Sequence, residues 1–161
     1  MPSISKKTAE KIIFYRFKDV YEKEKDIILE NIVHDESPDF IAINKNDDSS
    51  VGIEVTGVYQ NKEEAMLQYW RQDGWQDFFV GDQSELIKAF NDVLSKKAKK
   101  SFKYTPADKQ ILAIYMGSMV FHESIDLEFM RPEIIIPENK FSEIWILIKS
   151  YESKFKLYRL Q

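Results

Sequence analysis

Apolar residues recur at helical spacing in two stretches of the chain. Near the amino terminus they predict a helix over residues 5–24, which Ser5 or Thr8 can cap. The apolar positions of this first helix are Ile12, Ile13, Phe17 and Val20. In the centre of the chain the same spacing predicts a helix that Asp82 caps and that runs to about Ser101. Its apolar stripe consists of Leu86, Phe90, Val93 and Leu94.

Other stretches have the patterns of β-strands. Apolar and polar residues alternate over 40–44 and 51–59, and the polar segment between them has the composition of a turn. Residues 110–116 form a continuous apolar run, which predicts a buried strand. Residues 143–149 and 154–160 predict a terminal hairpin. Residues 26–33 are compatible with either a helix or a first strand, because short apolar runs do not discriminate between them.

An aromatic segment separates the second strand from the central helix. We predict a short helix over residues 61–71 and an aromatic loop over residues 69–81. The large rings of this loop are Trp70, Trp75, Phe78 and Phe79. Such rings stack on unpaired bases in some nucleic-acid-binding proteins, but they also fill cores and dimer contacts. A homodimer is therefore one of the open alternatives.

The order of these elements predicts a mixed α/β sheet covered by helices. The length of 161 residues is that of one domain, which we place over residues 1–161. The strand–helix–strand crossover from Val51 to Met116 is expected to be right-handed.

Composition excludes several classes of site. The chain has no cysteine, which removes disulfides, thiolate catalysis and cysteine-bound zinc. His34 and His122 are the only histidines and are far apart in the sequence, so we interpret them as structural. No apolar run approaches the roughly 20 residues that cross a bilayer. The first residues lack the apolar core of a signal peptide, so we expect a cytoplasmic protein without a membrane partner.

Two acids lie in or next to the alternating strands. Asp39 precedes the first of these strands, and Glu54 lies inside the second. Alternation places Glu54 and Thr56 on one face of the sheet, and the opposite face carries Val51, Ile53 and Val55. A carboxylate in a half-buried strand is unfavourable unless it is paired or binds a cation. A divalent metal is the simplest partner; the alternative is that Asp39 caps the strand and Glu54 forms a surface ion pair.

Residues 37–56 carry a motif that resembles the signature of the PD-(D/E)XK nuclease superfamily. That signature is Pro-Asp, a short gap, and then an acid, one residue and a lysine on the next strand. Pro38-Asp39 matches its first half and Glu54-Val55 the start of its second half. Thr56 stands where the lysine is expected, and this departure puts catalysis in question. The resemblance covers residues from about Thr8 to Gly117.

The resemblance implies a three-layer α/β/α restriction endonuclease-like core of order αβββαβ. Its first strand would come from residues 26–33, and the terminal hairpin would be an addition to the core. The implied activity is metal-dependent hydrolysis of DNA. The implied cofactor is Mg²⁺ or Mn²⁺, held by the carboxylates of Asp39 and Glu54 and by the backbone carbonyl of Val55. Gly52 and Gly57 flank Glu54 and indicate close approach of another group to this strand.

The missing lysine has a candidate replacement on the central helix. At 100° per residue, Lys97 continues the apolar stripe that faces the sheet, whereas Lys96 and Lys99 point well away. Some members of the superfamily supply their lysine from this helix. We therefore predict that Lys97 reaches over Glu54 and assists catalysis. The alternative is that Lys97 marks the helix end and extends into solvent.

The superfamily also places a glutamate on its first helix. Glu10 is the residue we assign to this role, because it lies one turn into the predicted helix. Glu30 is the alternative if residues 26–33 are helical. A glutamate in a first helical turn is also common simply because it favours the helix dipole.

Positive charge is concentrated at the end of the central helix, although the net charge of the chain is −4. Lysines that point outward there can contact phosphates, and they are Lys96, Lys99, Lys100 and Lys103. The alternative is a solvated helix end.

Three functions thus remain open at the level of sequence. The first is a metal-dependent nuclease acting on DNA. The second is a catalytically degenerate member of the same fold that binds nucleic acid or a protein. The third is an unrelated protein-interaction domain.

Overall fold

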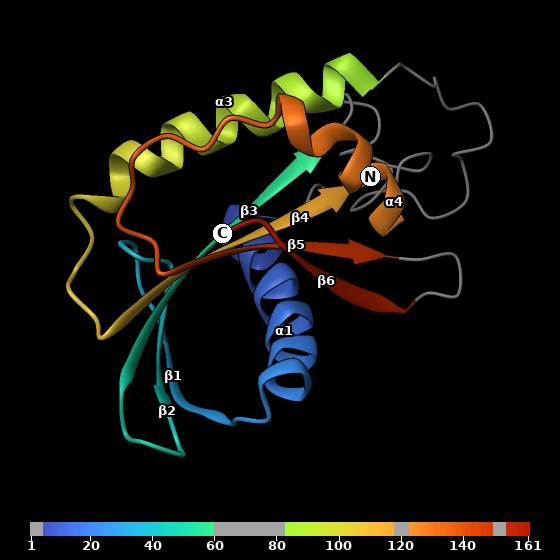
Figure 1. The fold of residues 1–161 in the computed structure, drawn as a ribbon. Coiled ribbons are helices and arrows are strands. Elements are labelled where there is room, and N and C mark those ends of the chain that lie inside the picture. Colours follow the sequence, from blue (N-terminus) through green and yellow to red (C-terminus); the bar gives the residue numbers. More distant parts are fainter. Residues whose placement is uncertain (1–4, 60–82, 118–122, 150–153) are drawn as a thin grey trace.

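The computed structural model describes residues 5–59, 83–117, 123–149 and 154–161, and these form a mixed six-stranded sheet with helices on both faces (Figure 1). The strands are β1 (Leu29–His34), β2 (Phe40–Asn44), β3 (Ser50–Tyr59), β4 (Lys109–Gly117), β5 (Glu143–Lys149) and β6 (Phe155–Arg159). Their spatial order follows the sequence. Strands β3, β4 and β5 are parallel, and the other neighbouring pairs are antiparallel. The predicted mixed α/β architecture is confirmed.

Helices lie against both faces of this sheet. Helix α1 (Lys6–Lys25) packs on one face, and α3 (Gln83–Ser101) and α4 (Ser124–Met130) pack on the other (Figure 1). A short 3₁₀ helix, η2 (Arg131–Glu133), follows α4. In the described part of the chain, no helix has the length and apolarity that crossing a membrane requires.

Side chains of β3 and β4 alternate between two apolar cores. The core under α1 contains Ile53 and Val55 of β3, and the core under α3 contains Val58. Residues of β4 divide in the same way, because successive side chains of a strand point to opposite faces. Glu54 therefore points toward α3, as the alternation of the sequence predicts.

Helix α1 begins and ends close to the predicted bounds. The hydroxyl of Ser5 accepts a hydrogen bond from the backbone N–H of Thr8 and caps the first turn. Asp26 adopts a left-handed conformation (φ 52°) that ends the helix. Residues 29–34 are then a strand, so the helical alternative for this stretch is wrong. Hydrogen bonding to β2 stabilises the extended conformation of residues 29–34.

Helix α3 presents its predicted stripe to the sheet. Leu86, Phe90 and Leu94 are buried, and Val93 is half-buried against the same core. Lys88, Lys96 and Lys99 are exposed. The predicted period of this helix is thus confirmed; its predicted cap, Asp82, lies outside the described residues, as do the predicted helix over 61–71 and the aromatic loop over 69–81.

The carboxy-terminal part combines a predicted hairpin with an element that the sequence analysis missed. Strands β5 and β6 pair as predicted, and β5 also joins the sheet beside β4. The unpredicted element is α4, whose outward side carries Ile125 and Phe129, both well exposed. This helix has only seven residues, and two of its exposed side chains are apolar, so it lacks the regular apolar and polar sides that mark an amphipathic helix.

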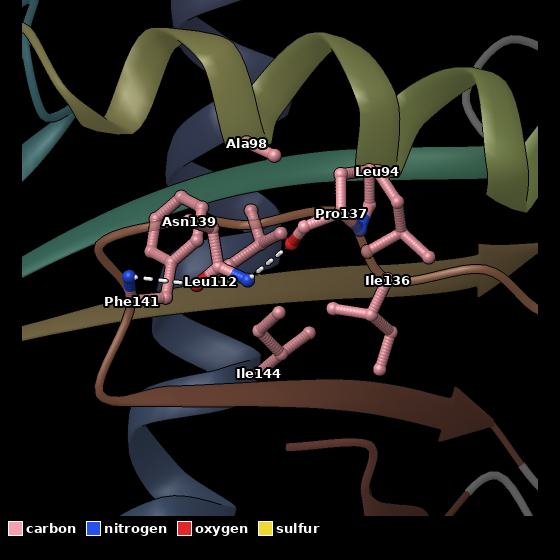
Figure 2. A pocket seen from close by; sticks show the side chains of 8 residues that line it. All are labelled: Leu94, Ala98, Leu112, Ile136, Pro137, Asn139, Phe141 and Ile144. Carbon is pink, nitrogen blue, oxygen red and sulfur yellow. Dashed lines mark hydrogen bonds between the residues drawn. The ribbon is translucent and has the colours of Figure 1, made fainter.

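A crevice between α3 and the sheet is closed by the segment before β5 (Figure 2). Its lining consists of Leu94, Ala98, Leu112, Ile136, Pro137, Asn139, Phe141 and Ile144. Asn139 fixes the turn by donating to the carbonyl of Pro137 and accepting from the N–H of Phe141, both at 2.9 Å. The space among these side chains does not admit a water molecule. It is therefore packed core that holds α3 in place above β3.

Candidate active site

The acids of the motif lie side by side where β2 begins next to β3. Phe40 pairs with Ile53, so Asp39 lies beside Glu54. The backbone N–H of Asp39 donates to Oε1 of Glu54 (3.0 Å), and that of Val55 donates to Oδ2 of Asp39 (2.9 Å). A further hydrogen bond joins the two carboxyl groups. The predicted pairing of these acids on adjacent strands is confirmed.

Both acids are buried, at 7% exposure for Asp39 and 3% for Glu54. Burial raises the pKa of Asp39 to about 8, with added contributions from the hydrogen bond and the negative charge of Glu54. Burial also acts to raise the pKa of Glu54. The hydrogen bonds from Asp39 and Tyr104 and the charge of Lys97 outweigh this and hold that pKa below its ordinary value. These opposite shifts favour a proton on Asp39 and the negative charge on Glu54.

Lys97 and Tyr104 converge on a single oxygen of Glu54. The Nζ of Lys97 lies 2.9 Å from Oε2, and the hydroxyl of Tyr104 donates to the same atom at 2.7 Å. The side chain of Lys97 is 16% exposed. Its predicted direction, toward the acidic pair and away from solvent, is confirmed, while its role in catalysis stays a prediction.

Tyr104 is a residue that the sequence analysis missed. It lies between α3 and β4, and its ring packs against Phe141 at 5.9 Å between centroids. Burial and the hydrogen bond to Glu54 raise its pKa well above the ordinary value, so its hydroxyl stays protonated. Tyr104 follows the lysine-rich end of α3. Neither the spacing nor the composition of that segment marks a tyrosine as part of a site.

Glu10 also lies near the pair. It projects from the first turns of α1, and its negative charge contributes to the raised pKa of Asp39. Glu30 lies on β1 and not on a helix, so the alternative first-helix acid is wrong.

His34 is a partner of Glu10, and nothing in its contacts contradicts the interpretation of this histidine as structural. Its Nε2 lies 3.0 Å from a carboxylate oxygen of Glu10. The ring stacks on Phe40, which also stacks on Phe14 of α1. The contact joins residues that are 24 positions apart in the sequence, and only the pairing of β1 with β2 brings His34 beneath α1. His122 lies outside the described residues.

The outward-pointing lysines behave as the helix geometry predicts. They are all exposed, and they are Lys96, Lys99, Lys100 and Lys103. Thr56, in the motif position of the lysine, is half-buried two residues after Glu54. An amine thus reaches the acidic pair from α3 and not from β3, and contact of the exposed lysines with nucleic acid stays a prediction.

Among the described residues, the potential metal ligands at this site are oxygen atoms of the two acids and of the backbone. Within the described ranges, no three His, Cys, Asp or Glu side chains are grouped so as to hold an ion. Magnesium needs no such group, because it is held by one or two carboxylates and keeps several waters. The carboxylates of Asp39 and Glu54 meet this requirement, and the carbonyl of Val55 as a third ligand stays a prediction.

Gly52 provides the close approach that the sequence analysis expected at this strand. A Cβ at this position would overlap Oε1 of Gln110 and lie 2.9 Å from Cγ of Pro38. The amide of Gln110 cannot move freely, because its nitrogen donates to the carbonyl of Thr105 (2.8 Å). Pro38 directly precedes Asp39. The absence of a side chain at Gly52 therefore lets Pro38, and with it Asp39, lie close to β3.

Gly52→Ala is expected to lower the free energy of unfolding by about 1–3 kcal/mol, the usual cost of overpacking. Denaturant titration followed by circular dichroism measures this difference. An alanine variant as stable as the wild type would show that Pro38 and Gln110 can move aside.

Asp39→Asn is expected to change how stability depends on pH. The raised pKa means that folded Asp39 keeps a proton that the unfolded chain releases above about pH 4. Retention of this proton stabilises the folded state. The contribution is complete below about pH 4, declines as the pH rises, and is lost by about pH 8. Asparagine keeps both hydrogen bonds but does not titrate, so the wild type should lose stability relative to this variant between pH 4 and 8.

The size of this relative loss is a few kcal/mol, because one pH unit between two pKa values corresponds to about 1.4 kcal/mol. Thermal unfolding of both proteins in the presence of a chelator measures it. A constant difference across this range would contradict the shared proton.

No match was found among protein-family models, curated proteins or solved structures.

Proposed function

We propose that this chain is a metal-dependent nuclease that hydrolyses phosphodiester bonds of DNA. The observation that carries the proposal is the buried pair of Asp39 and Glu54 with the amine of Lys97 on Glu54. Two acids and a lysine on adjacent elements are the combination that the superfamily motif requires. Here the lysine comes from α3.

The order of elements supports the proposal as well. Helix α1, strands β1 to β3, helix α3 and strand β4 follow one another as in the αβββαβ core of the restriction endonuclease-like fold. Asp39 directly precedes β2 and Glu54 lies within β3, which is the placement that the motif requires. Strand β6 and α4 would be additions to that core.

The acidic pair is suited to a divalent cation. In the metal-free chain a proton between the carboxyl groups reduces the repulsion of two buried charges. A cation can take the place of that proton, because metal ligands must be deprotonated. When bound by Asp39, Glu54 and the Val55 carbonyl, Mg²⁺ or Mn²⁺ supplies a Lewis acid for the phosphate and lowers the pKa of water.

The other residues have roles that follow from their positions. Lys97 would donate to the phosphate and offset the negative charge that develops there. Glu10 would add negative charge beside Asp39 and favour the cation. The exposed lysines at the end of α3 would contact the phosphate backbone on either side of the cleaved bond.

Cleavage of labelled single-stranded and double-stranded DNA in Mg²⁺ or Mn²⁺ tests the proposal. We expect the wild-type protein to cleave at least one of them, and a chelator to abolish cleavage until the metal is restored. Cleavage that persists in excess chelator would contradict the assigned chemistry.

Thr56 favours a second candidate, a member of the same fold that binds nucleic acid without cleaving it. Threonine lacks the positive charge of the motif lysine, and the amine of Lys97 is already paired with Glu54. Binding of DNA without cleavage in any metal, with no Mg²⁺ or Mn²⁺ uptake by calorimetry, would support this candidate.

A further inference from the structure

Two side-chain donors share one oxygen of Glu54. Oε2 accepts from both Lys97 and Tyr104, while Oε1 accepts from the N–H of Asp39. The two donors on Oε2 come from different segments, the last turns of α3 and the loop that precedes β4. The contact of Lys97 therefore does not depend on the same element as the contact of Tyr104.

We propose that Tyr104 is a positioning residue that holds Glu54 while Lys97 exchanges its contact from Glu54 to the phosphate of the substrate. This inference rests on the proposed nuclease function. Lys97 is bound to Glu54 in the free protein and must turn away from it to donate fully to a phosphate. A buried carboxylate oxygen left without any donor is strongly unfavourable. Tyr104 prevents that state, because its hydroxyl remains on the same oxygen.

The two donors differ in burial, as expected if Tyr104 stays on Glu54 while Lys97 moves to the phosphate. Tyr104 is buried, and its ring packs against Phe141. Lys97 is partly exposed and has a flexible four-carbon stem. Tyr104 is thus suited to stay in place and Lys97 to move. Without the tyrosine, Lys97 would be the sole donor on Oε2 and would be held there.

The test is a double-mutant cycle on turnover, with Tyr104→Phe, Lys97→Met and the double variant assayed on labelled DNA in Mn²⁺. Phenylalanine keeps the ring and removes only the hydroxyl. The matched control is Tyr158→Phe, because the half-buried Tyr158 of β6 also donates to a carboxylate, that of Glu128 (2.6 Å), in a solvent-exposed hydrogen bond.

We expect Tyr104→Phe to lower kcat about tenfold, the scale of one hydrogen bond to a charged group, with KM for DNA nearly unchanged. The control should cleave as the wild type does. The double variant leaves Oε2 of Glu54 without either side-chain donor, so it should be slower than Lys97→Met by more than the effect of Tyr104→Phe in the wild type.

Other outcomes would overturn the inference in distinguishable ways. A double variant slower than Lys97→Met by no more than the effect of Tyr104→Phe alone would mean that Tyr104 does not hold Glu54 in place of Lys97. Unchanged kcat in Tyr104→Phe, with an active wild type, would refute the inference and leave the nuclease function standing. An inactive wild type would overturn the proposed function and this inference together.

Discussion

Glu54→Gln is expected to lower metal-dependent DNA cleavage by about three orders of magnitude or more. Glutamine has nearly the shape of glutamate but lacks the charge that a divalent cation requires. It also removes the partner that holds the amine of Lys97 at the site. Loss of the cation and misplacement of Lys97 both weaken stabilisation of the negative charge that develops in the transition state. Removal of a single stabilising donor typically lowers the rate by about 10²–10³. Initial rates of cleavage at saturating Mn²⁺ measure the effect.

A stability control separates loss of chemistry from loss of fold. Glu54→Gln leaves the partly buried ammonium of Lys97 without its counter-charge, and breaking such a pair costs about 3–5 kcal/mol when it is fully buried. The double variant Glu54→Gln/Lys97→Met removes both charges and should recover part of that stability while remaining inactive. Cleavage at the wild-type rate by folded Glu54→Gln would contradict the assignment of this acid.

Lys97→Met is expected to lower turnover by about two orders of magnitude, the scale seen on losing one stabilising donor. Methionine keeps the apolar stem that continues the stripe of α3 and removes only the amine. Glu54 stays hydrogen-bonded to Tyr104 and to the N–H of Asp39, so the fold should persist. Single-turnover cleavage, with thermal unfolding as a check on folding, measures the result.

The matched controls are the neighbouring exposed lysines of the same helix. Lys96→Ala and Lys99→Ala should mainly weaken DNA binding, and more so at low salt, because exposed charges act through the phosphate backbone. Equal and small effects of all three substitutions would mean that the lysine run only attracts phosphate. The non-catalytic function would then be favoured.

Local patterns were sufficient to predict most of the framework of this site. The alternation around Glu54 gave its face of the sheet, and the period of α3 gave the direction of Lys97, because both periods are properties of the backbone alone. The turn between β2 and β3 placed Asp39 opposite Glu54. These predictions depend on residues close in sequence or on one regular element.

Residues that reach the site through tertiary contacts were missed. Tyr104 is 50 positions from Glu54 and lies in a loop whose path depends on how α3 packs on the sheet. His34 meets Glu10 only because residues 29–34 form a strand and not a helix, and the ambiguous short apolar run could not decide this. Helix α4 was missed because its outward side chains Ile125 and Phe129 are apolar.

The metal site is the central claim, and diffraction from crystals soaked in Mn²⁺ tests it most directly. A single peak of anomalous density in coordination contact with the carboxylates of both Asp39 and Glu54 is expected, and the same soak of Asp39→Asn should lack it. No peak at saturating Mn²⁺, or a peak that touches neither carboxylate, would contradict the metal site and with it the nuclease function.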